Sequence, residues 1–308
     1  MTRSFLTLGD LNREELFEIF QKALKLKAAI KARKEIFPLK NKVVGILFEK
    51  PSTRTRVSFE SAAIRLGGHA IYLSSNDLQL RRGEPVKDTA RVLGGYLDAL
   101  VARVYDHRTV EELAEYSGIT VINALSDIAH PTQAVCDLLT ILEVKGSLDG
   151  LTLAYIGDGN NVCQSLLECC ALAGVNIVAA CPEGYHPKAH ILDNALRIAE
   201  KSGSRITVVD DPTEAAKGAD ILYADVWVSM GEESEKEKKM KAFKGYQINA
   251  DLLSIAAKGA LVMHCLPAYR GLEITDDVIE CPQSIVWQQA ENKTHGAAAI
   301  LAFFMDSE

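Results

Sequence analysis

Residues 42–68 read KVVGILFEKPSTRTRVSFESAAIRLGG, and this stretch decides the fold. The apolar residues 42–49 predict a buried strand, and the segment after them predicts a helix from about residue 58 to residue 66. The pair Gly67-Gly68 ends that helix, and residues 68–73 predict a second strand. A strand, a helix and a strand in this order form a parallel pair with the helix packed on the sheet.

The same alternation of strands and helices extends along the rest of the chain. Further strands are expected at residues 99–104, 120–123, 151–156, 176–180, 205–209, 221–225 and 259–263. Further helices are expected within 12–34 and at 87–96, 110–117, 131–146, 163–173, 188–201, 212–217 and 292–305. This pattern predicts an α/β fold of two doubly wound parallel-sheet domains joined by long helices. The expected domains are residues 1–146 and 147–290, and residues 291–308 form a C-terminal helix that returns to the first domain.

The composition limits the kinds of partner that the chain can have. With 308 residues, of which 48% are hydrophobic, the chain is long enough for two domains with full cores. A net charge of -7 and an aromatic content of 6% argue against a nucleic-acid-binding face. The sequence shows no signal segment and no apolar run of membrane-spanning length. Its seven cysteines lack the spacing of a zinc or redox motif, so we expect reduced thiols, no metal site and a cytoplasmic protein.

The sharpest polar feature is STRTR at residues 52–56. It joins the first predicted strand to the first predicted helix, where unpaired amides and the helix dipole favour an anion. The hydroxyl groups of Ser52, Thr53 and Thr55 add donors, and Arg54 and Arg56 add guanidinium groups that suit phosphate oxygens. The sequence therefore predicts a phosphate site here, and the alternative is a capped helix with surface ion pairs.

With the preceding FEKP, this segment resembles the carbamoyl-phosphate signature shared by the aspartate and ornithine carbamoyltransferases. Arg103, at the end of a predicted strand, and HPTQ at residues 130–133 resemble two further parts of the family's pattern. The alternatives are a structural ion pair for Arg103 and a buried structural histidine for His130. The resemblance implies that carbamoyl phosphate is held by Ser52, Thr53, Arg54, Thr55, Gln79, Arg103, His130, Gln133, Cys265, Leu266 and Lys293. In the family, the residue at the position of Gln79 reaches the phosphate from a neighbouring subunit, and the alternative for Gln79 is a solvated loop residue.

In the second half of the chain, GDGNN at residues 157–161 follows a strand and opens a helix. Its spacing departs from the G-x-G-x-x-G of nicotinamide-binding proteins, but with Glu183 as a ribose ligand it leaves a dehydrogenase as an alternative. DVWVSMG at 225–231 resembles the D-x-x-x-S-M-G of ornithine carbamoyltransferases. HCLP at 264–267 and QAENK at 289–293 resemble two more family motifs, the second placed before the returning helix.

The resemblance implies that ornithine is bound by Asn161, Asp225, Ser229, Met230 and Cys265. It implies Arg103, His130, Asp225 and Cys265 as catalytic residues, with Cys265 as a contact of the amine and not as a covalent nucleophile. The family usually has arginine where this chain has Lys293, so the charge is kept and the bidentate fork is lost. The charged residues 232–244 are expected either as a solvated face or as a lid over the amino acid.

The activity that the resemblance implies is transfer of the carbamoyl group of carbamoyl phosphate to the δ-amine of L-ornithine. The products are L-citrulline and phosphate, as in arginine biosynthesis. No cofactor is expected, and the partners are the two small substrates and further copies of the chain in a homotrimer or a multiple of it. Neither nucleic acid nor membrane is expected as a partner. The alternatives are another amine such as putrescine or N-acetylornithine, an NAD-dependent dehydrogenase, or a non-catalytic amino-acid-binding protein.

Overall fold

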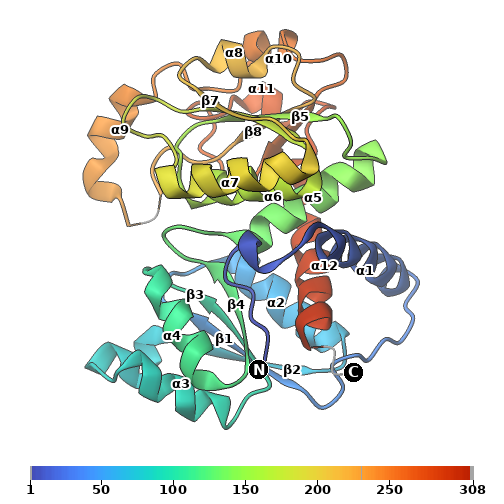
Figure 1. Cartoon of the computed structure of the whole chain (residues 1–308), viewed down its shortest axis with the longest axis vertical. Coiled ribbons are helices and arrows are strands. Elements are labelled where there is room, and N and C mark those ends of the chain that lie inside the picture. Colours follow the sequence, from blue (N-terminus) through green and yellow to red (C-terminus); the bar gives the residue numbers. More distant parts are fainter. Residues whose placement is uncertain (1, 230, 306–308) are drawn as a thin grey trace. The chain divides into compact units, whose positions relative to one another are not determined.

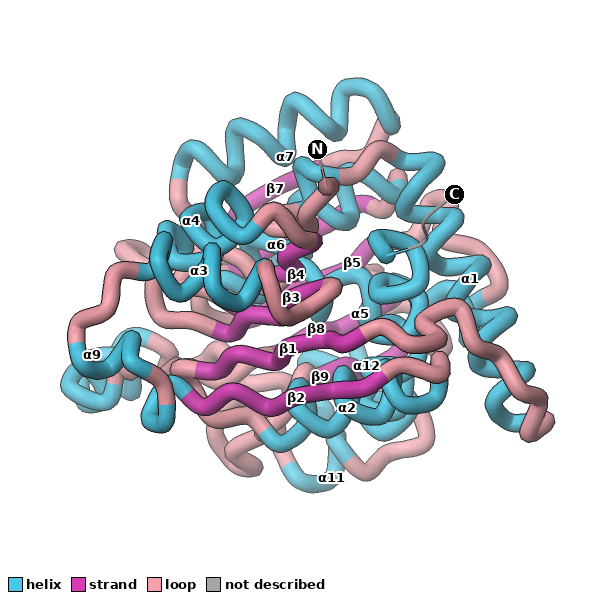
Figure 2. The backbone as a smooth tube through the Cα atoms, turned by 90° about the horizontal axis from the view of Figure 1, so that it is seen from below, coloured by secondary structure: helices cyan, strands magenta, loops and turns pink. Residues whose placement is uncertain are grey.

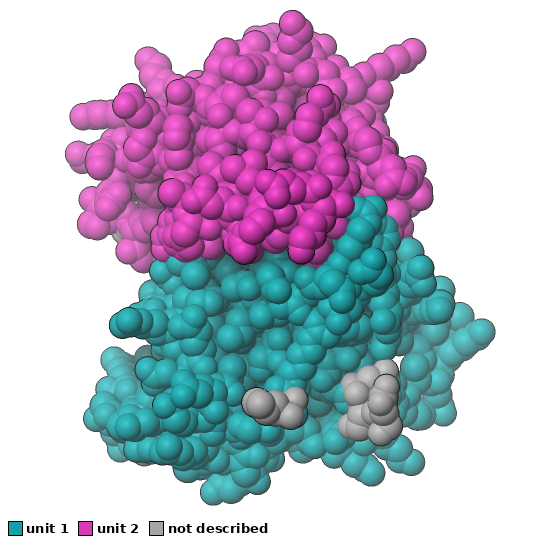
Figure 3. Space-filling view, viewed as in Figure 1, with its two compact units in different colours: residues 1–139, 291–308 teal, residues 140–290 magenta. Residues whose placement is uncertain are grey.

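The computed structural model describes residues 2–229 and 231–305, and the chain divides into two compact units (Figure 1, Figure 3). Unit 1 consists of Met1–Leu139 and Glu291–Glu308, and unit 2 consists of Thr140–Ala290. The chain leaves unit 1 within helix α5 (Pro131–Lys145) and returns within helix α12 (Val286–Met305). Each of these long helices therefore contributes residues to both units.

Unit 1 contains a sheet of four parallel strands in the order β2-β1-β3-β4 (Figure 2). Its strands are β1 (Val43–Phe48), β2 (His69–Ser74), β3 (Ala99–Arg103) and β4 (Thr120–Leu125). Its complete helices are α1 (Arg13–Lys31), α2 (Thr53–Arg65), α3 (Val86–Gly94) and α4 (His107–Ser117), with short 3-10 turns η1 (Leu8–Asp10), η2 (Ser75–Asp77) and η3 (Gln79–Arg82). Helix α2 contacts β1 and β2, and α4 contacts β4.

Unit 2 contains a sheet of five parallel strands in the order β7-β6-β5-β8-β9. Its strands are β5 (Thr152–Ile156), β6 (Asn176–Ala180), β7 (Ile206–Val209), β8 (Ile221–Ala224) and β9 (Leu261–His264). Its complete helices are α6 (Asn161–Ala173), α7 (Ala189–Ser202), α8 (Pro212–Ala216), α9 (Lys236–Ala242), α10 (Ala250–Ser254) and α11 (Asp276–Ile279), with a 3-10 turn η4 (Glu233–Glu235). The predicted α/β class with two parallel sheets is confirmed.

Apolar strand residues hold each sheet under its helices. In unit 1, Leu47 and Leu100 from the sheet pack with Ala90 of α3 and Leu113 of α4, and all four are buried. Complete burial of one leucine side chain contributes about 2 kcal/mol, so a core of this kind holds the polar ends of the strands in place. In the part of the chain that the structure describes, no helix is long and apolar enough to cross a membrane.

In both sheets the order of the strands reverses at one point. The chain of unit 1 goes from β1 to β2 on one side and then adds β3 on the other side of β1. The chain of unit 2 goes from β5 to β6 and β7, and then adds β8 on the other side of β5. Ligands of open α/β sheets bind outside the carboxyl ends of the strands at such switch points. The expected ligand positions are therefore the ends of β1 and β3 in unit 1 and the ends of β5 and β8 in unit 2.

Two helices begin at least about five residues earlier than the sequence predicted. Helix α2 begins at Thr53 and not near residue 58, because the hydroxyl of Ser52 caps it. Helix α12 begins at Val286 and not at residue 292, so the QAENK segment at 289–293 lies inside the helix and not before it. The predicted start of α12 was placed where its apolar residues begin. Gln, Ala, Glu and Lys in the segment before them are good helix formers, so the helix starts earlier.

Candidate active site

The predicted phosphate-binding segment lies at the amino end of α2, directly after β1. Ser52 Oγ accepts a hydrogen bond from Thr55 N at 3.3 Å and donates one to Thr55 Oγ1 at 3.2 Å. The amides of Thr53 and Arg54 precede the first hydrogen bond within the helix, so they face outward at the positive end of its dipole. This helix end therefore offers backbone and hydroxyl donors to an anion.

The two arginines of this segment have different surroundings. Arg56 pairs with Glu60 at 2.9 Å, and its guanidinium lies 3.6 Å from the centre of the Tyr72 ring. Arg54 is half-buried, and among the described residues its guanidinium has no hydrogen-bond or ion-pair partner. An anion that neutralised Arg54 would offset the cost of its partial burial. Arg54 is therefore the better candidate for a phosphate ligand, and Arg56 has a structural role.

Arg103 and His130 stand near the same switch point of unit 1. Arg103 ends β3 and is in register with Phe48, the last residue of β1. Both side chains are buried, with 9% of Arg103 and 4% of His130 exposed. Burial, and then the positive charges of Lys293 and Arg103, hold the pKa of His130 well below its ordinary range. At pH 7 His130 is therefore a neutral imidazole, which can donate an N–H without adding a further positive charge.

Gln133 and Lys293 also meet within unit 1, although 160 positions separate them in the sequence. Lys293 Nζ donates a hydrogen bond to Gln133 Oε1, and Gln133 Nε2 donates one to Asp137 Oδ1 at 2.7 Å. All three side chains are buried. Asp137 was missed by the sequence motifs. It stands four residues after Gln133 in the same helix, and this spacing, which brings side chains together, is the signal that was available.

Gln79 is the first residue of η3 and is exposed. Its contact with phosphate, which the family resemblance assigns to a neighbouring subunit, stays a prediction.

At the switch point of unit 2, the carboxylate of Asp225 accepts hydrogen bonds from three segments. Asn160 Nδ2 donates to Asp225 Oδ2 at 2.8 Å, and Val226 N and Cys265 Sγ donate to Asp225 Oδ1 at 2.8 and 2.9 Å. Only 6% of Asp225 and 9% of Cys265 is exposed. The ends of β5, β8 and β9 thus bring an amide, a carboxylate and a thiol to one place. A buried carboxylate held in this way suits an ammonium or amine ligand.

Asn160, which the sequence motif did not single out, makes the contact with Asp225. Its Oδ1 accepts hydrogen bonds from Val162 N at 2.9 Å and Cys163 N at 3.2 Å, so the same side chain caps α6. Asn161 is the first residue of α6 and is half-buried, and its contact with ornithine stays a prediction. An asparagine in the turn between a predicted strand and a predicted helix was the available signal for Asn160.

His264 holds the backbone that follows β9. Its Nδ1 accepts a hydrogen bond from Leu266 N at 2.8 Å, so its Nε2 carries the proton and donates to Glu273 Oε1 at 3.1 Å. Leu266 has φ of +59°, a conformation that costs a leucine free energy and needs such support. His264 is therefore structural, and the predicted contacts of Cys265 and Leu266 with carbamoyl phosphate stay predictions.

The predicted segment around Ser229 is connected to the charged run that follows it. Met230 lies outside the described residues. Ser229 N donates to Glu232 Oε2 at 3.1 Å, and Lys239 Nζ lies 2.5 Å from both Glu232 Oε2 and Asp158 Oδ2. Lys239 is 3% exposed, so the charged run is not a uniformly solvated face. Its role as a lid stays a prediction.

The ionisation of this cluster follows from its burial. Burial raises the pKa of Asp158 to about 6, although Lys239 beside it opposes the rise. Burial lowers the pKa of Lys239, but Asp158 and Glu232 outweigh that effect and leave it raised. We therefore regard Lys239 as a charged group that ties the turn after β8 to the turn after β5.

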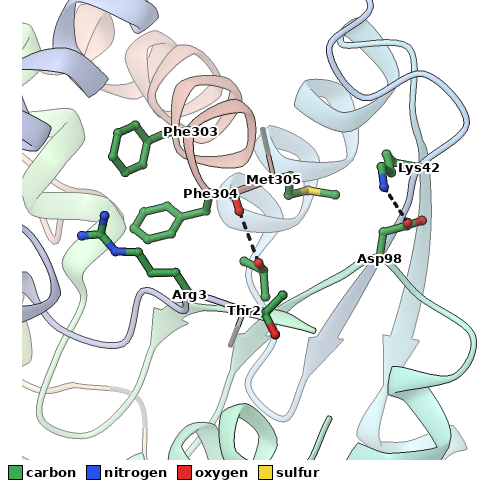
Figure 4. Close-up of a pocket in the computed structure, with 8 residues that line it drawn as sticks. Thr2, Arg3, Lys42, Asp98, Phe303, Phe304 and Met305 are labelled. Carbon is green, nitrogen blue, oxygen red and sulfur yellow. Dashed lines mark hydrogen bonds and ion pairs between the residues drawn. The ribbon is translucent and has the colours of Figure 1, made fainter. Parts of the chain in front are cut away.

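A cavity of about 440 Å³ lies elsewhere in unit 1 (Figure 4). It is lined by Thr2, Arg3, Lys42, Asp98, Thr120, Phe303, Phe304 and Met305. Lys42 pairs with Asp98 at 3.1 Å, and Thr120 Oγ1 donates to Phe304 O at 3.3 Å. None of these lining residues belongs to the motifs above, so this cavity is not part of the candidate site.

Comparison with known proteins gives the chain a family. Residues 3–143 match "Aspartate/ornithine carbamoyltransferase, carbamoyl-P binding domain", and residues 149–304 match the family's "Asp/Orn binding domain". The chain is 51% identical to ornithine carbamoyltransferase of Methanosarcina acetivorans over 305 residues, which are 99% of this chain and 100% of that protein. The structure of ornithine carbamoyltransferase from Pyrococcus furiosus is 48% identical with a TM-score of 0.96, covering 100% of this chain and 98% of that one. For the enzyme from Thermus thermophilus these values are 41%, 0.89, 99% and 99%. The chain belongs to the aspartate/ornithine carbamoyltransferase family.

Proposed function

We propose that this chain transfers the carbamoyl group of carbamoyl phosphate to the δ-amine of L-ornithine, giving L-citrulline and phosphate. The observation that carries the proposal is the buried carboxylate of Asp225, oriented by Asn160 and Cys265 at the switch point of unit 2. The 51% identity to a protein named ornithine carbamoyltransferase, over 99% of this chain, supports the same reaction.

We assign carbamoyl phosphate to unit 1. Its phosphate is bound at the amino end of α2 by Ser52, Thr53, Arg54 and Thr55, and Arg54 supplies the compensating charge. The half-buried position of Arg54 supports this assignment.

The carbonyl oxygen of carbamoyl phosphate is assigned to Thr55, Arg103 and His130. These donors stabilise the negative charge that grows on that oxygen as the amine attacks. Because burial keeps His130 neutral, it acts as a hydrogen-bond donor at pH 7 and does not need to lose or gain a proton. Gln133 and Lys293 hold the carbamoyl end.

We assign ornithine to unit 2. Asp225, with Ser229 and Met230, holds the α-amino acid end, and Asn161 supports it. Cys265 contacts the amine that reacts, and Asp225 Oδ1 orients the Cys265 thiol. An alkyl amine has an ordinary pKa of about 10, so a site that favours the neutral amine raises the fraction able to react.

In the reaction, the lone pair of the neutral δ-amine attacks the carbamoyl carbon and forms a tetrahedral intermediate. The bond between that carbon and the phosphate oxygen then breaks, and the electron pair leaves with phosphate. Formation of the C–N bond makes the attacking nitrogen positively charged, and this nitrogen gives one of its protons to the departing phosphate. Side chains that already point at the phosphate and the carbonyl oxygen need not reorganise as the charge moves.

An assay of the products tests this proposal. Purified chain is incubated with carbamoyl phosphate and, separately, L-ornithine, putrescine, N-acetylornithine or L-aspartate, and the carbamoylated product and phosphate are measured. Citrulline formed with ornithine, at a rate far above that with the other amines, is the expected result. Preferred turnover of another amine would overturn the assignment of unit 2. Binding of carbamoyl phosphate without turnover of any amine would show a binding protein.

We also propose that the chain works as a homotrimer or a multiple of it in the cytoplasm. The family resemblance and the assignment of Gln79 to a neighbouring active site support the assembly, and the seven cysteine side chains, which are thiols, support the compartment. Sedimentation equilibrium at assay concentrations tests the assembly, and a fully active monomer would contradict it.

A further inference from the structure

The side-chain amide of Gln133 lies between two buried groups of opposite charge. The ammonium of Lys293 donates to its oxygen, and the carboxylate of Asp137 accepts from its nitrogen. Asp137 is 0% exposed, Gln133 1% and Lys293 7%. The reversed amide would turn its NH2 toward the ammonium and its oxygen toward the carboxylate. Loss of two charge-assisted hydrogen bonds disfavours that orientation by at least about a hundredfold.

The contact between α5 and α12 that brings Lys293 to Gln133 depends on a glycine. A Cβ atom at Gly296 would lie 2.3 Å from Cys136 Sγ, closer than any normal contact. Gly296 stands one turn after Lys293, and Cys136 stands one turn after Gln133. Glycine weakens a helix interior, so its presence inside α12 is explained by this close approach. Cys136 Sγ also lies 4.0 Å from Lys293 O.

We propose that Asp137 is a positioning residue for the carbamoyl group, because with Lys293 it fixes the direction of the Gln133 amide. This inference rests on the proposed binding of carbamoyl phosphate by unit 1. The Gln133 oxygen has a second lone pair, which accepts an N–H of the carbamoyl NH2. In the reversed orientation, the NH2 group of Gln133 would face the NH2 group of carbamoyl phosphate, and neither could accept a hydrogen bond. Asp137 thus acts on the substrate through Gln133 without touching it.

The proposal has a consequence for substrate selection. A fixed acceptor favours an acyl phosphate that carries NH2 next to its carbonyl group. It gives no such contact to a methyl group, and it repels a carboxylate oxygen. Discrimination of this kind is strong because a mismatched ligand leaves a buried polar group without a partner. The phosphate end of the ligand is held at α2 and does not depend on Asp137.

Two stable phosphonates separate these two parts of the site. Phosphonoacetamide carries the carboxamide of carbamoyl phosphate, and methylphosphonate lacks it. Their dissociation constants for the full-length chain are measured by calorimetry at pH 7.5, without ornithine. The ratio of the two constants is the preference for the amide, and any change that affects both phosphonates equally cancels in this ratio.

The variants are Asp137→Leu, which removes the acceptor, and Asp137→Asn, which keeps an acceptor oxygen but removes the charge. We expect Asp137→Leu to reduce the preference about tenfold and Asp137→Asn to reduce it about threefold, with methylphosphonate binding changed less than the amide's. Val135→Ala, in the same helix, is the control for lost stability, and it leaves the preference unchanged. Equal weakening of both phosphonates, or a preference within about twofold of wild type in Asp137→Leu, overturns the proposal. If Asp137→Leu does not fold, an unchanged preference in Asp137→Asn overturns it.

The wild-type chain separates this inference from the proposed function. A wild type that binds neither phosphonate contradicts the assignment of carbamoyl phosphate to unit 1, and the inference falls with it. A wild type that binds both equally keeps the phosphate site and overturns the inference alone. In the last case the wild type prefers phosphonoacetamide and makes citrulline, and the Asp137 variants show the same preference. This result also overturns the inference alone.

Discussion

The amino end of α2 in unit 1 and the surroundings of Asp225 in unit 2 both lie at sheet switch points, but they differ in their internal bonding. At α2, the half-buried Arg54 has no partner among the described residues, and the first amides of the helix face outward. At Asp225, both carboxylate oxygens already accept hydrogen bonds from the protein. In the function that we propose, a phosphate completes the first region, whereas the second has both carboxylate oxygens satisfied by the protein.

The difference shows two ways to prepare a site for a charged substrate. Donors left without protein partners bind an anion strongly, because the anion supplies the hydrogen bonds and the opposite charge that these partly buried groups lack. A carboxylate that already accepts hydrogen bonds from the protein binds a cationic ligand less strongly. Its orientation is fixed before the ligand binds, and this helps to orient an amine. Substitutions should therefore reduce activity most in the first region, and they should affect structure more in the second.

The largest effect is expected from Arg54→Ala. Removal of this proposed phosphate-binding side chain should lower kcat/KM for carbamoyl phosphate by about a thousandfold, since no other guanidinium replaces it. The matched control is Arg56→Ala, which removes an arginine already paired with Glu60 and stacked on Tyr72. It should cost less than about tenfold. Initial rates of citrulline formation measure both, and equal losses would remove the distinction between the two arginines.

A smaller effect, on stability, is expected from Lys239→Met in unit 2. The variant leaves Asp158 and Glu232 without their shared cation and should lower the free energy of unfolding by about 3 kcal/mol. Lys241→Met changes an exposed lysine of the same helix and should stay within about 0.5 kcal/mol of wild type. Urea unfolding at pH 7 gives both values. A Lys239→Met chain as stable as Lys241→Met would mean that the buried cluster contributes nothing.

Gly296→Ala should destabilise unit 1 by about 2 kcal/mol, because its new methyl group collides with the Cys136 thiol. Cys136→Ala removes the sulfur and should relieve most of this cost in the double variant. A double-mutant cycle of unfolding free energies measures the coupling. Additive effects of the two substitutions would show that the helices do not depend on this contact.

The smallest effect is a pH dependence of opposite sign in the two units. Burial is the first cause of the lowered pKa of His107, His130 and His295 in unit 1. The unfolded chain takes up these protons near pH 6.5, so their contribution to stability is present above that pH and is lost below it. The raised pKa of Asp158 in unit 2 acts the other way. Its contribution is present below the ordinary value of 3.8 and is lost as the pH rises through about 6.

Hydrogen exchange, read separately for each unit between pH 4.5 and 7.5, measures this dependence once intrinsic rates are corrected. The double variant His107→Gln/His295→Gln should weaken the pH dependence of stability in unit 1 and leave that of unit 2 unchanged. The same slope in both units would contradict the assignment of these shifts.

Periodicity and motif order predicted most of the strands and helices, the α/β class and the family. They did not predict the order of strands within each sheet, because that order depends on contacts between distant segments. For this reason the contact between Asn160 and Asp225, across the switch point of unit 2, could not be expected. The starts of α2 and α12 were missed because polar residues there continue or cap the helix, while only apolar residues set the predicted period.

The sequence singled out the candidate site residues that belong to a motif. It did not single out the residues that act through a neighbouring side chain. Asp137 and Lys239 are charged residues in helices, and such residues are expected in water by default. Both are buried because a partner of opposite charge or suitable polarity meets them in the folded chain. Pairings of this kind are set by tertiary packing and leave only a weak trace in spacing, such as the four residues from Gln133 to Asp137.

Asn160 has a consequence for which sequences can replace this one. Serine, threonine and aspartate are normally good substitutes for an asparagine before a helix. At this position the oxygen of the side chain caps α6 while its nitrogen donates to Asp225, so the residue must accept and donate in two fixed directions. Aspartate would set two carboxylates against each other, and a hydroxyl is too short to make both contacts. Among the residues that usually cap a helix, only asparagine therefore satisfies both contacts. We expect substitutions at position 160 to be nearly absent from active descendants of this chain.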